Sequence, residues 1–492
     1  MKSYQNLFVC LFCWMLMPMA WAERPNILFI AVDDLRPEFG AYGADYVKSP
    51  NLDRIAKAGI TFQRAYCQQA VCSPTRSSLM TGTRPDTTKV WDLNTHFRTA
   101  LPDVVTLGEH FKNNGYFVQG MGKIYHGGFD DPQTWSVPWQ TPKAQAYGLA
   151  ENLALNNRQP NTGNQNANNR RNQATPRNSR GPAYEGADVR DNTFQDGKVA
   201  ELALSALNEI NKKKEPFFLA VGFTKPHLPF VAPKKYYDLY DPAKIQLAPN
   251  KYRPKDAPEY SVQPGGELRA YHGIPAESIP DDLARQLKHG YYAAISYMDA
   301  QVGLLLDELD KLGLAKNTIV ILWGDHGWKL GEHDAWCKHS NCENDTNTAL
   351  LLSVPGMKHA GAKTKGLVEF VDIYPTLADL AGLSLPSHLE GTSFKGLIEN
   401  PHQTWKKAAF SQYPRSAQGK SIMGYSMRTD RYRFTAWVDR QDHSKIEAIE
   451  LYDHQTDPQE NQNLALQSDM KSTVHELTRQ WRAGWQAAMP TR

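Results

Sequence analysis

Three carboxylates of this sequence come directly after apolar segments, at the points where strands would end. Asp33 and Asp34 follow one such segment, and Asp325 and His326 follow another after a single glycine. Either pair alone is also typical of a turn or a helix cap. Together they supply oxygen ligands for a hard cation, with His326 as a nitrogen ligand or an outer contact. We expect one Ca²⁺ ion here rather than Mg²⁺ or Mn²⁺, and a pair of zinc ions would need more histidines.

Four basic or imidazole side chains follow two further apolar segments. Lys123 and His126 come after one segment, and Lys225 and His227 come after the other. A lone histidine in such a place is ordinarily a hydrogen-bonded surface or core residue. Lysines and histidines that gather at one place, however, bind anions and move protons. These four groups therefore join the carboxylates as candidates for a single site.

Cys72 begins the pentapeptide Cys-Ser-Pro-Thr-Arg. Pro74 is tolerated in the first turn of a helix and Gly82 is a typical helix stop, so the pattern predicts a helix that starts at position 72. The amides and the dipole at a helix N-terminus favour a bound anion. Arg76, one turn later, can hold an oxyanion or orient a nucleophile. The alternative is a structural cysteine, bonded to Cys67.

These groups need a scaffold that brings the ends of distant segments together. Short runs rich in branched residues predict buried strands, with helical patterns between them. The strands are Asn26–Val32, Tyr116–Gly120, Pro216–Gly222 and Thr318–Trp323, and the helices are Asp103–Asn114, Asp191–Lys213 and Asp281–Leu312. This alternation predicts an α/β fold with a large, mostly parallel sheet sandwiched by helices. Ligands of such sheets bind beyond the carboxyl ends of the strands. The polar residues that follow the four strands are therefore expected at one edge of the sheet.

Two regions depart from this alternation. Residues 156–180 form an Asn- and Arg-rich insertion without acidic residues, which predicts a mobile, solvated loop. Its arginines are alternatively contacts for a polyanionic substrate. After residue 400 the pattern becomes that of antiparallel strands followed by a helix: Ala408–Tyr413, Tyr425–Thr429, Tyr432–Val438 and Ser468–Ala488, with the segment from Glu450 as a connecting turn. We expect a catalytic domain at 23–400 and a smaller C-terminal α+β domain, with an antiparallel sheet, at 401–492.

The composition and the first residues indicate an exported globular protein. The chain has 492 residues, 41% hydrophobic and 22% charged, and its net charge of +3 gives no reason to expect a nucleic acid partner. Lys2, the apolar run Leu7–Met17 and the small-x-small site that ends at Ala22 predict a signal peptide at 1–22. The run is short for a membrane anchor, and no later stretch is apolar enough to span a bilayer. We expect a periplasmic or secreted protein without a membrane segment after cleavage.

Export leaves four cysteines in the mature chain: Cys67, Cys72, Cys337 and Cys342. An even number in an oxidising compartment permits disulfides, but four are too few to be the scaffold of so large a protein. Cys337 and Cys342 either pair through a small loop or stay free.

The pentapeptide and its surroundings resemble the type I sulfatases. Cys-Ser-Pro-Thr-Arg at 72–76 matches their C-x-P-x-R signature, in which the cysteine is oxidised to formylglycine. Further matches over nearly the whole mature chain are Asp33-Asp34, Thr81-Gly82, Gly122-Lys123 with His126, Gly324-Asp325-His326-Gly327 and the Leu-Tyr-Asp segment near the end. The resemblance implies the alkaline-phosphatase-like sulfatase fold, formylglycine made from Cys72, and one Ca²⁺ ion.

A closer resemblance is to the iduronate-2-sulfatase group. It rests on Arg84-Pro-Asp-Thr-Thr88 followed by Trp91-Asp-Leu-Asn94, on Lys225-Pro-His-Leu-Pro-Phe230, and on Gly327-Trp-Lys-Leu-Gly-Glu-His333. Lys338 falls where that group carries an active-site lysine. The Asn/Arg-rich insertion and the Cys337/Cys342 pair depart from the group and leave substrate choice open. The implied substrate is a sulfated carbohydrate, with the 2-O-sulfate of a uronic acid in glycosaminoglycan or ulvan-type fragments as the expected position.

The resemblance also implies a mechanism. One hydroxyl of the hydrated formylglycine attacks sulfur, and loss of the proton from the other hydroxyl expels sulfate. The implied roles are metal binding by Asp33, Asp34, Cys72, Asp325 and His326, binding of the diol and sulfate oxygens by Arg76 and Lys123, action on the leaving oxygen by His227 and Lys338, proton uptake by His126, and substrate contacts by Lys225, Trp328 and His333.

Two alternatives compete with the sulfatase interpretation. One is a phosphonate or phosphate ester hydrolase of the same superfamily, which can share the nucleophile position and some ligands. The other is a non-catalytic glycan-binding protein on this scaffold, which the complete catalytic set disfavours. The expected partners are a sulfated oligosaccharide or polysaccharide and a formylglycine-generating or anaerobic sulfatase-maturating enzyme.

Overall fold

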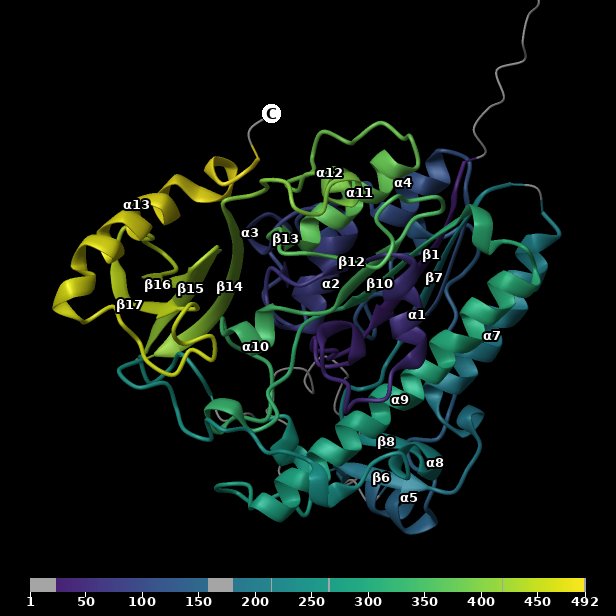
Figure 1. Cartoon of the computed structure of the whole chain (residues 1–492), viewed down its shortest axis with the longest axis horizontal. Helices are drawn as coiled ribbons and strands as arrows, with labels where there is room; N and C mark the ends of the chain where they lie inside the picture. The colour runs from purple at the N-terminus through teal and green to yellow at the C-terminus, as the bar shows by residue number, and fades with distance from the viewer. Residues whose placement is uncertain (1–23, 158–179, 214, 264–265, 418, 491–492) are drawn as a thin grey trace, which may run out of the picture.

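The computed structural model describes residues 24–157, 180–213, 215–263, 266–417 and 419–490. Its main feature is a seven-stranded sheet within these residues (Figure 1). The strands, from one edge to the other, are β12 (Ala362–Thr364), β2 (Ile60–Phe62), β11 (Leu350–Ser353), β10 (Thr318–Gly324), β1 (Asn26–Val32), β7 (Phe217–Phe223) and β4 (Phe117–Gly122). Only β11 runs antiparallel to its neighbours, so the prediction of a mostly parallel sheet is confirmed.

The four predicted strands lie side by side at the centre and one edge of this sheet. In the order β10, β1, β7, β4 they are all parallel, with Leu28 of β1 opposite Val320 on one side and Leu219 on the other. Their observed ends differ from the predicted ends by at most two residues. Because the strands are parallel and adjacent, their carboxyl ends meet at one edge, as expected. The short strands β2, β11 and β12 were not predicted.

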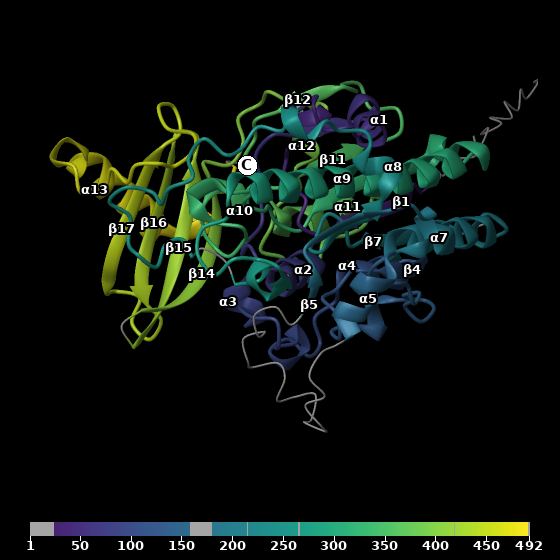
Figure 2. The ribbon, with the colours of Figure 1, turned by 90° about the horizontal axis from the view of Figure 1, so that it is seen from below.

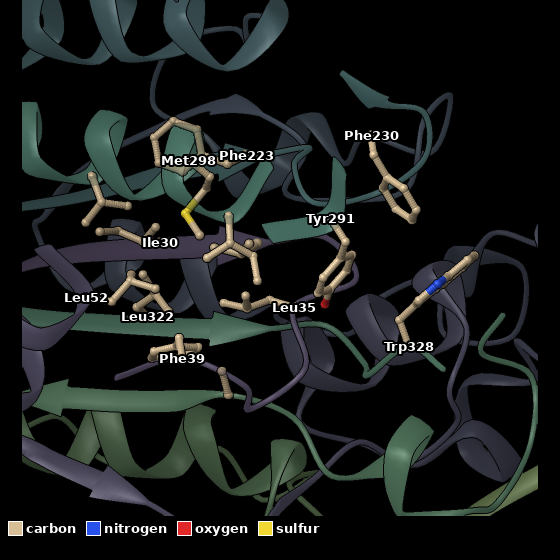
Figure 3. Packing of buried hydrophobic residues seen from close by; sticks show 14 of the residues in the cluster. Ile30, Leu35, Phe39, Leu52, Phe223, Phe230, Tyr291, Met298, Leu322 and Trp328 are labelled. Atoms are coloured by element: carbon tan, nitrogen blue, oxygen red, sulfur yellow. The ribbon is translucent and has the colours of Figure 1, made fainter. Parts of the chain in front are cut away.

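Helices cover both faces of the sheet because alternate strand residues point to opposite sides. One face packs against α1 (Pro50–Ala58), α7 (Gln195–Asn211) and α9 (Asp281–Lys311). Figure 3 shows this core, where Ile30 and Leu322 of the sheet lie beneath Met298 of α9 and beside Leu52 of α1. The other face packs against α2 (Cys72–Thr81), α4 (Leu107–Asn113) and α11 (Ile373–Leu380). The sheet is thus the middle layer of an α/β/α sandwich.

A second sheet follows near the C-terminus. Its antiparallel strands are β14 (Ala408–Ala417), β15 (Lys420–Thr429), β16 (Tyr432–Asp439) and β17 (Ile446–Asp453), and helix α13 (Lys471–Ala487) covers the face that is turned away from the main sheet (Figure 2). The prediction of a connecting turn from Glu450 is wrong for Glu450–Asp453, because these residues pair with β16. The polar side chains of Glu450 and Asp453 accept hydrogen bonds from other side chains of the C-terminal domain. The wrong prediction arose because polar residues are typical of loops.

Smaller elements lie in the connections between these strands and helices. They are β3 (Ala65–Tyr66), α3 (Pro85–Thr88), α5 (Ala150–Asn157), β5 (Arg180–Pro182), β6 (Tyr184–Ala187), β8 (Phe230–Pro233), α8 (Lys234–Tyr237), β9 (Tyr271–His272), α10 (Glu343–Thr346), β13 (Val368–Glu369) and α12 (Lys395–Glu399). The predicted signal peptide lies outside the described residues, and so does the predicted 156–180 loop except at its ends. Those ends are not loop, since they belong to α5 and β5. None of the described helices is long and apolar enough to cross a membrane.

Candidate active site

Four acidic and imidazole side chains converge where β1 and β10 end. Asp33 and Asp34 follow β1, while Asp325 and His326 follow β10, and all four are fully buried. The backbone N–H groups of Asp34 and His326 both donate to Asp325 Oδ1, each at 3.0 Å. Asp34 has a left-handed backbone with φ of 59°, and Tyr291 of α9 donates its hydroxyl proton to the Asp34 carbonyl at 2.6 Å. Neighbouring strands and one helix therefore fix the turn that presents these carboxylates.

This cluster fits one divalent cation. One ligand atom each from Asp33, Cys72, Asp325 and His326 lie within 4.8 Å of one another, and His326 Nδ1 lies 3.3 Å from Asp34 Oδ1. Three buried carboxylates need compensating positive charge, since an uncompensated buried charge is very costly. The donor set is mainly carboxylate oxygen, which suits a hard cation.

Basic side chains compensate part of this negative charge. Lys123, from the end of β4, bonds Asp33 Oδ2, and Lys338 Nζ lies 3.0 Å from Asp34 Oδ1. Burial opposes ionisation of Asp33, but the nearby cations, above all Lys123, hold its pKa well below the usual value. Burial raises the pKa of Asp34 in spite of Lys338. The site thus combines buried anions with the buried cation of Lys338 and the partly buried cation of Lys123, which is the setting expected for binding charged groups.

Cys72 is the first residue of α2, as predicted. Its Sγ lies 3.2 Å from His326 Nε2, 3.4 Å from Asp33 Oδ1 and 3.8 Å from Lys123 Nζ. It is a free thiol and is not bonded to Cys67, and Cys337 and Cys342 are free as well. Burial and the Asp33 charge raise the pKa of the Cys72 thiol well above its usual value. An unmodified thiol here is therefore a poor nucleophile, although its place in the cluster is central.

Arg76 lies one helical turn further along α2 and is fully buried. Its Nε donates to Asp325 Oδ2 at 2.9 Å, and its Nη1 donates to the carbonyls of Lys123 and of Ile124, the latter at 3.0 Å. The guanidinium carbon lies 5.5 Å from the Trp323 ring centre of β10. Arg76 therefore ties α2 to the ends of β4 and β10 as well as carrying charge.

His126 and a neighbouring cavity lie on the Lys123 side of the cluster. Burial, together with the Lys123 and Arg76 charges, lowers the pKa of His126 to about 3, so that its ring is neutral near pH 7. Its Nδ1 is buried without a hydrogen-bond partner among the described residues. A cavity of about 510 Å³ lies beside Lys123 and His126 and is also lined by Trp139 and Gln195. This space is large enough for a sugar unit.

His227 and Lys338 both contact the carboxylate of Glu267, a residue that was not predicted for the site. Glu267 accepts from His227 Nε2 at 3.0 Å and from Lys338 Nζ at 2.9 Å. Burial opposes protonation of His227, but Asp34 and Glu267 outweigh it and raise the histidine pKa. Glu267 lies in an irregular segment just before β9, where no motif or periodicity distinguishes it. Only the three-dimensional structure brings it to the site.

The three residues expected to contact substrate are buried in this structure. Trp328 is fully buried in the core, and Lys338 Nζ lies 4.8 Å from the centre of its ring. His333 is 1% exposed, and both its ring nitrogens lack a partner among the described residues. Lys225 Nζ donates to the carbonyls of His227 and Pro229, at 2.8 and 2.5 Å. Trp328 therefore lies against Lys338, Lys225 bonds the backbone of His227, and little of either side chain is exposed.

Comparisons with known proteins agree with this arrangement. Residues 25–383 match the family model described as Sulfatase, and residues 331–485 match the model described as N-sulphoglucosamine sulphohydrolase, C-terminal. The iduronate 2-sulfatase of Mus musculus is 35% identical over an alignment of 530 positions, which covers 92% of this chain and 93% of the mouse protein. An ulvan-active sulfatase of Formosa agariphila is 28% identical and covers 92% of this chain and 80% of its own length.

The fold also has close structural neighbours. A solved structure in complex with its substrate D-glucosamine-2-N,6-O-disulfate superposes with a TM-score of 0.73 at 20% identity, covering 95% of this chain and 98% of the other. At that level of identity the likeness concerns the fold alone.

Proposed function

Since this chain belongs to the sulfatase family and is a sulfuric ester hydrolase, we propose that it removes the 2-O-sulfate of a uronic acid from fragments of a sulfated polysaccharide. The observation that carries this proposal is the convergence of Asp33, Cys72, Asp325 and His326 within 4.8 Å, together with the 35% identity to an iduronate 2-sulfatase. Glycosaminoglycan and ulvan-type chains both offer such a group, and an ulvan-active relative supports the second source.

We further propose that Cys72 is converted to formylglycine by a maturating enzyme. The hydrated aldehyde supplies an oxygen nucleophile together with a second hydroxyl through which sulfate can leave without attack of water on sulfur. The raised pKa of the unmodified Cys72 thiol supports this proposal, because a protonated thiol would contribute little as a nucleophile. The first turn of α2 places residue 72 beside both the acidic cluster and Lys123.

Asp33, Asp34, Asp325 and His326 would hold Ca²⁺ together with residue 72. The ion supplies positive charge that polarises oxygen atoms near it. Oxygen donors from three carboxylates favour Ca²⁺ over softer metals. Arg76 holds Asp325 in place, and Lys123 lies against both Asp33 and residue 72.

The remaining basic groups have separate tasks in this proposal. Lys123 and Lys338 bind sulfate oxygens, on which negative charge is spread in the transition state. His227 donates a proton to the leaving sugar oxygen, and Glu267 favours the protonated form of this histidine. His126, neutral near pH 7 and with a partner-free Nδ1, accepts a proton from residue 72. The sugar occupies the cavity beside Trp139.

The cellular setting is part of the proposal. With the predicted signal peptide at residues 1–22, the enzyme would act in the periplasm or outside the cell. Residues 23–400 are proposed as the catalytic domain and 401–492 as the C-terminal domain, although the second sheet also contributes contacts close to the site. For example, Arg415 of β14 bonds the carbonyl of His339, next to Lys338.

Sulfate release from a panel of defined oligosaccharides tests the substrate. The panel compares 2-O-sulfated terminal uronic acids with 6-O- and N-sulfated sugars, and includes aryl sulfate and aryl phosphate esters. We expect release from the 2-O-sulfated uronic acids, and higher activity on the sulfate ester than on the phosphate ester. Preference for phosphate would favour a phosphate or phosphonate ester hydrolase, while binding without release by modified enzyme would favour a glycan-binding protein.

Mass spectrometry of the peptide that carries residue 72 tests the modification. The active enzyme should show an aldehyde in place of the thiol, and Cys72→Ala should fold normally and lack activity. Active enzyme that carries only unmodified cysteine, or activity of the Cys72→Ala variant, would refute the proposed nucleophile.

A further inference from the structure

A second cavity, lined by other residues than the catalytic cluster, lies between the main sheet's connecting segments and the C-terminal sheet. Its volume is about 570 Å³, within the range of small-ligand sites. It is bounded by α3, by β14 and β15, and by the end of α13, which Figure 1 shows alongside the C-terminal sheet. Its aromatic wall consists of Phe410, Tyr425, Trp481 and Trp485.

A break in α13 places the last of these aromatic rings. Gly484 has φ of 77° and ψ of 179°, which interrupts the helix one residue before Trp485. A residue with a side chain rarely adopts this positive φ. The Trp485 ring centre lies 4.8 Å from the guanidinium carbon of Arg84. Trp485 is therefore held against the cavity by a specific backbone turn and by a cation–π contact.

The floor of the cavity contains polar atoms that the described residues leave without partners. Gln68 is 1% exposed and lines the cavity, yet neither its Oε1 nor its Nε2 has a hydrogen-bond partner in the described part of the chain. Arg84 Nε is also buried without a partner there. A buried amide that bonds nothing costs free energy, and each such group calls for an explanation. Both groups could be satisfied by a ligand that both donates and accepts.

The buried charged groups of the cavity wall are already paired, whereas Arg482 lines the cavity as an exposed side chain. Asp86 accepts from Gln412 at 2.9 Å and from the Tyr425 hydroxyl at 2.7 Å. The guanidinium of Arg84 forms two hydrogen bonds with Glu369, at 2.8 and 2.9 Å. Apart from the exposed Arg482, the wall offers a ligand a neutral amide, one N–H donor and aromatic surface. The buried part of the cavity therefore favours a neutral group over a sulfate or a carboxylate.

We propose that this cavity binds a neutral pyranose unit of the polysaccharide that the active site desulfates. The C–H face of a pyranose packs on an indole ring such as Trp485, while its hydroxyls both donate and accept and so match the amide of Gln68. Binding there raises the effective concentration of the chain at the active site. The identity of the polymer rests on the proposed function, whereas the pyranose chemistry rests on the cavity itself.

The test uses the full chain and two polymers, ulvan and a 2-O-sulfated glycosaminoglycan. Binding is measured by affinity electrophoresis in the Cys72→Ala background, so that the polymer stays intact. Activity of the modified enzyme is measured as kcat/KM on the polymer and on a sulfated disaccharide that is too short to reach both sites. The variants are Trp485→Ala and Gln68→Met, with Tyr252→Ala, an aromatic residue 54% exposed elsewhere on the surface, as control.

We expect Trp485→Ala and Gln68→Met each to weaken binding to the polymer that the wild type desulfates by about tenfold. Their kcat/KM should fall on that polymer and stay unchanged on the disaccharide, and Tyr252→Ala should match the wild type in every assay. Gln68→Met removes only an amide without partners, so the thermal stability of this variant should not fall. It therefore still tests the proposal if Trp485→Ala folds poorly.

Unchanged polymer binding by both variants would overturn the proposal, as would an equal loss of kcat/KM on the polymer and the disaccharide. Failure of the wild type to release sulfate from any 2-O-sulfated uronic acid would instead refute the proposed function. In that case the electrophoresis, which needs no turnover, still decides whether the cavity binds a sugar chain.

Discussion

Replacing Arg76 by lysine tests whether the geometry of the guanidinium, rather than its charge, holds the site together. Arg76 is fully buried and bonds Asp325 through Nε and two carbonyls of the 123–124 segment through Nη1. A lysine keeps the positive charge but is a single point donor without the planar fork. The lysine ammonium can donate to the Asp325 carboxylate or to the carbonyls of the 123–124 segment, but not to both at once.

The expected loss follows from the groups left without partners. A buried hydrogen-bonding group that loses its partner costs about 1–3 kcal/mol. Because two such groups lose their partner, Arg76→Lys should lower the free energy of unfolding by about 2–6 kcal/mol. This is a large part of the total for a typical protein, which is about 5–15 kcal/mol. Turnover should fall by about 10²–10³, the usual effect of removing one positioned donor that stabilises developing charge.

Urea denaturation, with and without added Ca²⁺, measures the first effect, and sulfate release measures the second. Arg54→Lys is the matched control, because Arg54 pairs with Asp307 on the surface with 41% of its side chain exposed. Its stability should change by no more than about 0.5 kcal/mol. If Arg76→Lys behaved like this control and kept its turnover, the argument that the guanidinium fork is required would be refuted.

Three further predictions concern the metal, the acid catalyst and the C-terminal sheet. Removal of Ca²⁺ by a chelator should lower both activity and thermal stability, because three buried carboxylates lose their counter-charge, and added Ca²⁺ should restore both. The Asp325→Asn variant should be insensitive to the chelator, and an equal response of this variant and the wild type would argue against the assigned ligands. Glu267→Gln removes a charge that raises the pKa of His227, so the high-pH limb of kcat should move to lower pH; an unchanged limb would show that His227 is not the acid. Burial raises the pKa of Glu450 from 4.5 to about 7, so the folded state holds a proton between these pH values that the unfolded state has lost, and stability falls as pH rises through this window. Between about pH 4.5 and pH 8, the free energy of unfolding should therefore fall by up to about 3 kcal/mol less in Glu450→Gln than in the wild type. Denaturation of both proteins at both pH values measures this difference, and an identical pH dependence would contradict the raised pKa of Glu450.

The candidate site was largely predictable because its residues follow local signals. Asp33 and Asp325 come at strand ends, and a chain that alternates strands and helices forms parallel neighbours whose carboxyl ends share an edge. Cys72 precedes Pro74 and Gly82, which mark the start and the end of a short helix. Such signals are contained in a few consecutive residues, so they can be recognised without knowledge of the fold.

Other features carry no local signal. The strands β2, β11 and β12 have three or four residues, too few to show a period. The second half of β17, Glu450–Asp453, was predicted as a turn because it contains polar residues, which the fold buries. Glu267 stands in an irregular segment, and nothing near it in the sequence indicates that it bonds both His227 and Lys338. Gln68 resembles any polar residue before a helix until its burial is known.

The order of residues alone reveals which chemical groups are present and which of them begin or end an element: the three aspartates, the histidines, the lysines and the cysteine at a helix start. Which of these groups contact one another depends on the folded arrangement. Asp34 and Lys338 are 304 residues apart in the chain and 3.0 Å apart in space. The physical reason is that pairing and burial depend on contacts between distant segments, and these contacts remove the solvent that would otherwise weaken each charge and leave each pKa near its ordinary value.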